Sequence, residues 1–162
     1  MKPRVILPDQ SRTIRLYETV FRWGVGSDET GGALSMLEVT IPARTLIKPH
    51  AHEREDEYSL VLSGTIGVRT GDEVVEVVPA GSWLIKPRSV PHALWNVGDE
   101  PARVLEVITP GGLEQYFTDI APILREHGPE WTQRYREAAD AYGLTILDDW
   151  TDELQERYGI KL

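Results

Sequence analysis

Two histidines and a run of acidic residues in the stretch PHAHEREDEYSLVLSG, positions 49–64, are groups that could bind a metal ion. His50 and His52 are two residues apart, and side chains with that spacing on a β-strand point to the same face, roughly 7 Å apart along it. Four acidic residues follow: Glu53, Glu55, Asp56 and Glu57. The histidines can therefore converge on one cation, with a carboxylate close by.

One of these carboxylates, Glu57, is expected to face the histidines. It stands at an odd offset from His52, so a straight strand would direct it to the opposite face. The polar sequence EREDE can bend the chain at the surface, which would return Glu57 toward the histidines. The rest of the acidic run is then expected to form a solvated turn.

A third histidine lies in GSWLIKPRSVPHALWN, positions 81–96. Segment 87–91 turns the chain, after which His92, Leu94 and Asn96 share one face of a strand. Three neutral nitrogen donors and one anionic oxygen suit a divalent first-row metal: Fe, Mn, Co, Ni, Cu or Zn. The alternative is three surface histidines that act only as hydrogen-bond partners.

The elements that would position these side chains change character near position 111. Before it, short segments rich in β-branched and aromatic residues are separated by Gly and Pro, which is typical of a β-sandwich or barrel. The predicted strands are Leu34–Ile41, Tyr58–Leu62, Thr65–Thr70, Val74–Val78, Ser82–Lys86, His92–Val97 and Arg103–Thr109. Helices are predicted only after position 112, over Glu114–Arg125, Pro129–Tyr142 and 148–158. These helices either cover one end of the barrel or form a subunit contact, and His127 between them is interpreted as a solvated or capping residue.

Composition and charge restrict the class of protein. The chain has 162 residues, enough for one domain with its own core, and no cysteine, which excludes disulfides and thiolate metal sites. Its formal net charge of −9 argues against nucleic acid, whose binding relies on clustered Lys and Arg. Neither a signal peptide nor a membrane span is evident, so we expect no membrane partner and a soluble, cytoplasmic protein that acts on a small molecule.

We divide the chain into N-terminal strands and a loop at 1–30, a barrel core at 31–110 and a helical tail at 111–162. The tail is expected to pack on the barrel or on a partner subunit. A homodimer is expected, because an N-terminal strand such as Arg4–Leu7 and exposed barrel edges invite pairing.

The two histidine-containing stretches resemble the paired motifs of the cupin superfamily. The first motif reads His-x-His, three or four residues, Glu, six residues and Gly; its positions here are His50, His52, Glu57 and Gly64. The second reads Gly, five residues, Pro-x-Gly, two residues, His, three residues and Asn; its positions here are Gly81, Pro87, His92 and Asn96. Ser89 stands where the second motif usually has Gly. The resemblance covers roughly positions 31 to 109.

This resemblance implies an all-β fold, an antiparallel jelly-roll barrel with a helical C-terminal extension. It also implies one divalent transition metal per chain, with ligands His50, His52, Glu57 and His92. Four protein ligands leave coordination positions open, as in a catalytic rather than a closed structural site. Ser89 lies in the turn before His92 and affects that turn more than it affects a ligand.

The similarity to single-domain cupins of the quercetin-dioxygenase type suggests a metal-dependent dioxygenase. Its substrate would be an enol or phenol, flavonol- or diketone-like, with Glu57 as both ligand and catalytic proton acceptor. Two alternatives stay open: a polyketide cyclase or isomerase that uses no oxygen, and a non-catalytic small-molecule-binding cupin. The substrate pocket is expected to involve residues that could equally be plain core: Met36, Ile85, Leu94, Asn96 and Phe117.

Overall fold

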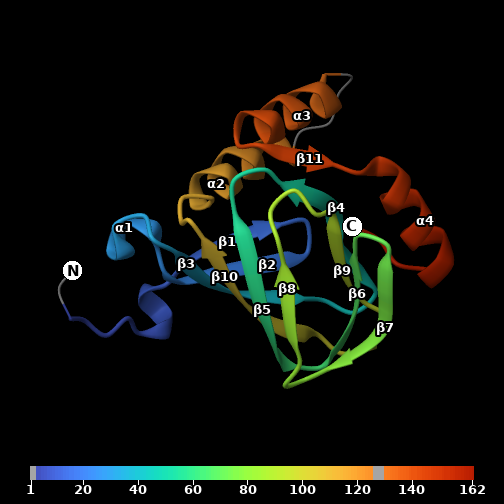
Figure 1. The fold of residues 1–162 in the computed structure, drawn as a ribbon, viewed down its shortest axis with the longest axis horizontal. Coiled ribbons are helices and arrows are strands. Elements are labelled where there is room, and N and C mark those ends of the chain that lie inside the picture. Colours follow the sequence, from blue (N-terminus) through green and yellow to red (C-terminus); the bar gives the residue numbers. More distant parts are fainter. Residues whose placement is uncertain (1–2, 126–129) are drawn as a thin grey trace.

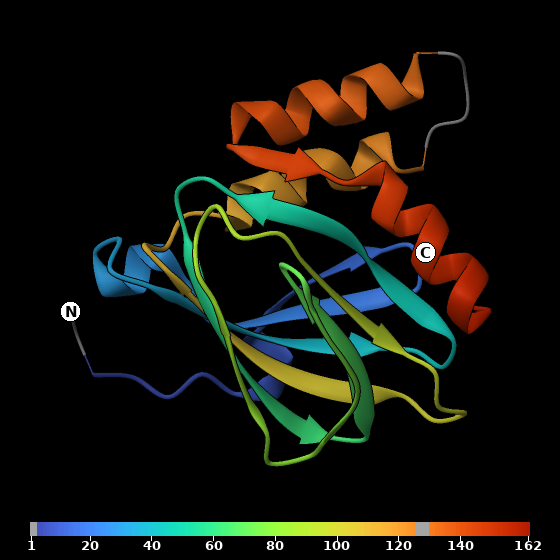
Figure 2. The same cartoon turned by 45° about the vertical axis from the view of Figure 1, so that its right-hand side comes forward.

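The computed structural model describes residues 3–125 and 130–162, whose strands form two antiparallel sheets packed face to face (Figures 1 and 2). Sheet A has the strand order β1 (Arg12–Leu16), β2 (Thr19–Val25), β3 (Ser35–Ile41), β10 (Ala102–Thr109), β5 (Asp56–Ser63), β8 (Trp83–Lys86). Sheet B has the order β11 (Leu144–Ile146), β4 (Thr45–His52), β9 (His92–Asn96), β6 (Thr65–Thr70), β7 (Glu73–Pro79). This arrangement confirms the predicted all-β jelly-roll.

Alternation of side chains along the strands builds the core between the sheets. Val104 on β10 lies opposite Val39 on β3 and Val61 on β5, so three neighbouring strands contribute one apolar layer. Ile66 and Leu94 from sheet B belong to the same buried cluster. Burial of this apolar surface, worth about 25 cal/mol per Å², is the main force that holds the sheets together.

The C-terminal tail covers one end of the barrel (Figures 1 and 2). Helices α2 (Glu114–Ile123) and α3 (Trp131–Ala141) pack on each other there, and β11 joins the edge of sheet B beside β4. Helix α4 (Asp148–Tyr158) packs along sheet B, where Leu154 joins Leu46 and Trp95 in a second buried cluster. The tail therefore packs on the barrel.

Several elements correct the sequence-based prediction. The short helices η1 (Pro8–Gln10) and α1 (Ser27–Thr30) precede position 112, and β11 adds a strand to the predicted helical tail. Segment 4–7 is not a strand. Prolines at positions 3 and 8 flank it, and proline cannot donate to a β-ladder. The predicted residues His127 and Pro129 lie outside the described residues.

The described helices are all too short or too polar to cross a lipid bilayer. The longest of them, α3 and α4, have 11 residues each, whereas a transmembrane helix needs about 20 apolar residues.

Candidate metal centre

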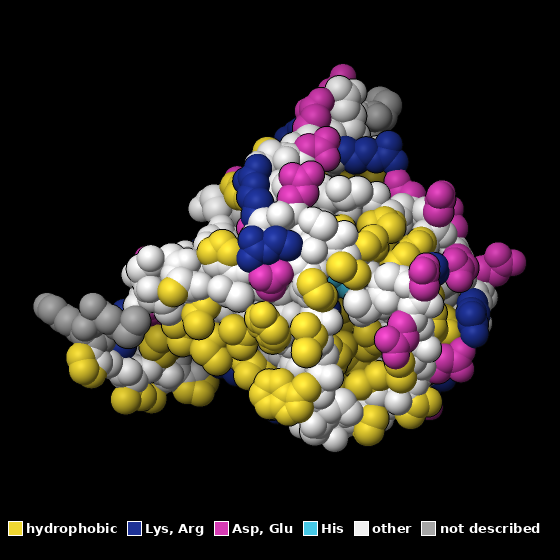
Figure 3. Space-filling model, viewed as in Figure 1, with side chains coloured by type: hydrophobic (Ala, Val, Ile, Leu, Met, Phe, Trp, Pro, Cys, Tyr) yellow, Lys and Arg dark blue, Asp and Glu magenta, His cyan; other side chains and the backbone are white. Residues whose placement is uncertain are grey.

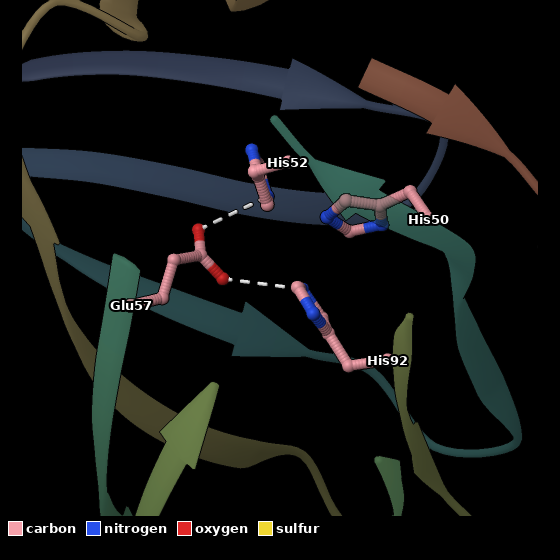
Figure 4. A group of neighbouring side chains, drawn as sticks. All are labelled: His50, His52, Glu57 and His92. Carbon is pink, nitrogen blue, oxygen red and sulfur yellow. Dashed lines mark ion pairs between the residues drawn. The ribbon is translucent and has the colours of Figure 1, made fainter. Parts of the chain in front are cut away.

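Four side chains from three strands converge inside the barrel (Figure 4). His50 and His52 come from β4, Glu57 from β5 and His92 from β9, and one donor atom of each lies within 4.8 Å of the others. The Glu57 carboxylate spans two of the rings, with Oε1 3.4 Å from His52 Nε2 and Oε2 3.3 Å from His92 Nε2. The four residues that the sequence motifs indicated therefore form one cluster.

Local backbone geometry brings the ligands together across both sheets. His50 lies opposite His92 in the β4–β9 ladder, and an irregularity between Ile47 and His50 shifts the register at that point. Glu57, Ser59 and Val61 point inward from β5, as the alternation of that strand predicted. The bend between β4 and β5 thus returns Glu57 to the histidines despite its odd offset from them.

Hydrogen bonds from the outer ring nitrogens fix the orientation of two histidines. His50 Nδ1 lies 2.6 Å from the carbonyl oxygen of Lys48, and His92 Nδ1 lies 3.2 Å from that of Val90. A carbonyl only accepts, so each Nδ1 carries the proton and each Nε2 keeps its lone pair for the cluster. His52 Nδ1 faces the carboxylate of Glu55 at 3.6 Å.

The Nε2 atoms that face the centre of the cluster are placed where a metal ion could bind them. Among the residues that the structure describes, His52 Nε2 and His92 Nε2 are buried without a hydrogen-bond partner. Leaving such atoms unpaired costs roughly 1–3 kcal/mol each. Imidazole nitrogens with one carboxylate are ordinary ligands of divalent transition metals, so the donor set fits such an ion.

The electrostatics of the cluster favour the protonation states that metal binding requires. Burial, together with the neighbouring His92 and His52, holds the pKa of His50 well below its usual value, and burial also lowers the pKa of His92. Burial disfavours the Glu57 anion, but Lys86 and His52 outweigh it, so the pKa of Glu57 stays well below the ordinary value. His50 and His92 are thus held as neutral imidazoles and Glu57 as a carboxylate at neutral pH.

A second group of charged residues, which the sequence analysis missed, adjoins the cluster. Lys86 on β8 is 2 % exposed, and its ammonium lies 2.7 Å from Glu57 Oε2 and 2.9 Å from Glu106 Oε2. Ser59 also donates a hydrogen bond of 2.7 Å to Glu106 Oε2. Burial raises the pKa of Glu106. Burial lowers the pKa of Lys86, but the neighbouring carboxylates of Glu106 and Glu57 outweigh it, so the pKa of Lys86 is raised. A charged residue at the inward position between Val104 and Ile108 was the available signal for Glu106.

The metal-ligand cluster opens into a largely apolar cavity of about 100 Å³, enough for several water molecules or part of a small organic molecule. Both sheets and the tail line it: Phe21 and Leu37 from sheet A, Leu94 from sheet B, and Tyr116 and Phe117 from α2. In Figure 3 a small histidine surface is visible within a hollow surrounded by hydrophobic side chains.

Two of the five predicted pocket residues, Leu94 and Phe117, line this cavity. The other three require correction. Ile85 faces outward from β8 and is 67 % exposed, and Met36 occupies an outward position of β3, because each strand alternates its faces. Asn96 is buried, but its amide closes a turn by donating to the carbonyls of Ile41 and Glu100.

The acidic run is less solvated than predicted. Glu53 is exposed, but Glu55 is 8 % exposed beside His52. Asp56 accepts hydrogen bonds from the backbone N–H and the guanidinium of Arg88, at 2.8 Å and 2.7 Å. These contacts tie the β4–β5 turn to the segment before His92, so the turn helps to position two residues of the cluster.

Ser89 ties the same segment to the ligand strand. Its backbone N–H donates a 2.6 Å hydrogen bond to the carbonyl oxygen of His52, and its φ is +63°. That left-handed conformation favours glycine, which explains the glycine at this position of the motif. Gly64, the last residue of the first motif, has φ +79°, and a Cβ there would lie 2.9 Å from Ala102 Cα.

Comparison with known proteins supports the same fold. Residues 37–108 match the profile of the family described as "Cupin domain". The chain is 33% identical over 76 residues to germin-like protein subfamily T member 2 of Arabidopsis thaliana, covering 44% of this chain and 34% of that protein. It is 29% identical over 76 residues to the H2HPP isomerase of Bacillus subtilis, covering 47% of this chain and 32% of that protein. The chain thus spans only about a third of these curated relatives.

Among solved structures, KdgF from Halomonas sp. has a similar fold. The two superimpose with a TM-score of 0.62 at 15% sequence identity, over 70% of this chain and 99% of KdgF. The match covers nearly the whole of KdgF and leaves out part of this chain.

Proposed function

We propose that this chain is a metal-dependent cupin enzyme that acts on a small enolisable or phenolic molecule in the barrel cavity. One observation carries the proposal: three imidazoles and a carboxylate converge at the wall of a largely apolar cavity, with a further buried carboxylate beside them. A purely structural metal site is commonly closed by its protein ligands and needs no adjoining cavity. Concave, mostly apolar pockets with a few convergent polar groups are typical binding sites for small molecules.

The chain's own residues have separate parts in this function. The three histidines, through Nε2, and the Glu57 carboxylate would hold one divalent transition metal. When bound, such an ion supplies a Lewis acid that polarises a carbonyl, enol or phenol oxygen. Lys86 keeps the Glu57 carboxylate oriented from the side of sheet A. The walls formed by Phe21, Leu37 and Phe117 exclude water and accommodate the apolar part of the substrate.

Two reactions of an enolate are candidates. The sequence resemblance favours oxygen-dependent cleavage of a flavonol- or diketone-like substrate. The buried Glu106 favours the second, an isomerisation or cyclisation without oxygen, because such a reaction needs a group that removes a proton at one atom and returns it at another. The similarity of this chain to an H2HPP isomerase supports the same choice.

Metal analysis and oxygen uptake test the proposal. Protein purified without a histidine tag is expected to contain close to one transition metal ion per chain, and His92→Ala is expected to lose it, while His127→Ala keeps it. An oxygen electrode with a flavonol or a β-diketone then separates the reactions, since only cleavage consumes oxygen. Metal-free wild-type protein, or equal metal loss in the two histidine variants, would contradict the proposal.

A further inference from the structure

Glu106 is the buried carboxylate of the cavity that the motifs do not account for. We propose that Glu106 Oε1 exchanges a proton with the substrate, and that the substrate is a small organic monoanion with an acidic C–H beside a carbonyl, such as a 2-keto acid. This inference rests on the proposed metal-dependent function and deepens it. It differs from the expectation that Glu57 acts as both ligand and proton acceptor.

The hydrogen bonds of Glu106 leave one of its oxygens available. Ser59 Oγ and Lys86 Nζ both contact Oε2, at 2.7 Å and 2.9 Å. Oε1 has no hydrogen-bond partner within the described chain, and Glu106 lines the cavity. A carboxylate fixed through one oxygen, with the other at the cavity, has the geometry of a group that accepts a proton from a bound molecule.

Both oxygens of Glu57, by contrast, are already engaged. Oε1 faces His52 Nε2, while Oε2 faces His92 Nε2 and lies 2.7 Å from Lys86 Nζ. A carboxylate that binds a metal and an ammonium is a poor proton acceptor, because both cations stabilise its anionic form. The two carboxylates on either side of Lys86 are thus suited to different tasks.

The charges around the cavity indicate the charge of the substrate. Glu57, Glu106 and Lys86 sum to −1 as ions, so a divalent cation brings the site to +1. Lys48 also reaches the cavity but is paired with Asp148 at 2.9 Å. A net positive charge among apolar walls is costly unless an opposite charge neutralises it, so the loaded site favours a monoanion.

The proton transfer requires no oxidant. The C–H bond next to the substrate carbonyl breaks, the proton moves to Glu106 Oε1, and the electron pair enters the carbonyl to form an enolate. Return of the proton to the same carbon restores the substrate, and its return to another carbon of a conjugated system gives an isomer. Atoms and electrons balance in both directions.

Deuterium exchange tests this role with phenylpyruvate as the probe. The metal-loaded wild type in D2O is expected to accelerate exchange of the benzylic protons, followed by proton NMR. Glu106→Gln is expected to lower the accelerated rate about 100-fold or more, as losing a general base typically does. The variant is also expected to keep its metal and, with one negative charge fewer, to bind phenylpyruvate more tightly in calorimetry. A merely structural role would not produce that opposite pair of effects.

Glu38→Gln is the matched control, because Glu38 lies on the outer face of sheet A, paired with Arg22 and Arg103. It is expected to exchange at the wild-type rate. Wild-type exchange in Glu106→Gln, or loss of phenylpyruvate binding together with exchange, would overturn the role of Glu106 and leave the metal function standing. A metal-loaded wild type that gives no acceleration would overturn the substrate class, and wild-type protein unable to hold metal would overturn the proposed function itself.

Discussion

Glu53 and Glu57 belong to the same acidic run, yet they meet opposite environments. Glu53 is exposed, whereas Glu57 is 6 % exposed and surrounded by Lys86, His52 and His92. The difference arises from the bend between β4 and β5, which turns the last residue of the run inward. Substitution should therefore separate the two residues sharply.

Glu57→Gln keeps the size of the side chain but removes the anion opposite the bound cation. We expect metal occupancy to fall strongly, because Lys86 would then face the metal without a carboxylate between them. Glu53→Gln is the control and is expected to keep full metal content, with the free energy of unfolding changed by about 0.5 kcal/mol or less. Metal analysis measures the metal content of the two variants, and urea unfolding measures their stability. Equal metal loss in Glu57→Gln and Glu53→Gln would refute the assignment of Glu57.

The resemblance of two stretches to the cupin motifs was sufficient to find the His/Glu cluster, because it marked all four residues that the fold brings together. Spacing could not find Lys86 and Glu106, which lie on separate strands, 20 residues apart, and meet only through pairing with β5. The alternation along β10 could have indicated that Glu106 faces inward, but nothing in the sequence states which strand lies beside it. Partnership across a sheet is decided by long-range topology.

At the scale of elements, the turn between β8 and β9 connects the strands that carry the residues of the His/Glu cluster. Ser89 bonds the backbone of His52, and the backbone of Arg88 bonds Asp56. The backbone N–H groups of the turn make these contacts, so the positions of the contacts depend on the backbone conformation of the turn. Its left-handed serine is the least favourable feature of that conformation.

Ser89→Gly is expected to raise the free energy of unfolding by up to about 1.5 kcal/mol. A left-handed non-glycine residue costs about 1–2 kcal/mol, and glycine's extra chain entropy offsets roughly 0.5–1 kcal/mol of the relief. Gly81→Ala is the control, since φ there is +90° and its Cβ would meet nothing within 4 Å, so a loss of stability would come from the backbone alone. Urea midpoints measure both variants, and a Ser89→Gly variant less stable than wild type would contradict the strain argument.

Elements with clear alternation, such as β3, β6 and β10, were predicted within about a residue of their observed bounds. The strands β4 and β11 were not identified as elements. Pro49 and a register shift interrupt the pattern of β4, and β11 has only three residues between two helices. A short strand of this kind forms because a neighbouring strand of the same chain pairs with it, and the local sequence does not reveal which strand that is.

At the scale of the whole molecule, exposed hydrophobic side chains gather on the outer face of sheet A over β5 and β8 (Figure 3). Trp83 and Ile85 on the edge strand β8 are 69 % and 67 % exposed, and Tyr58 and Leu62 of the neighbouring β5 are also exposed. We propose that this hydrophobic patch binds a second copy of the chain. Segment 4–7, which was expected to pair in a dimer, is not a strand. Two chains of net charge −9 repel each other least where the surface lacks carboxylates.

Trp83→Lys tests this homodimer. A central aromatic contact is worth about 2 kcal/mol or more at an interface, so we expect the variant to be monomeric by light scattering at concentrations where wild type is dimeric. Val77→Lys, on edge strand β7 of sheet B and 70 % exposed in the wild type, is the matched control and should remain dimeric. A monomeric wild type would remove the proposal.

The pairing of β11 with β4 means that the sheets of the barrel extend beyond the region that the cupin profile matches. The profile match ends at residue 108, yet Leu144 pairs with His52 and Ile146 with His50. The tail also supplies Tyr116 and Phe117 to the cavity wall. Substitution of Tyr116 or Phe117 would therefore reshape the cavity wall from outside the matched region and leave all four residues of the His/Glu cluster in place.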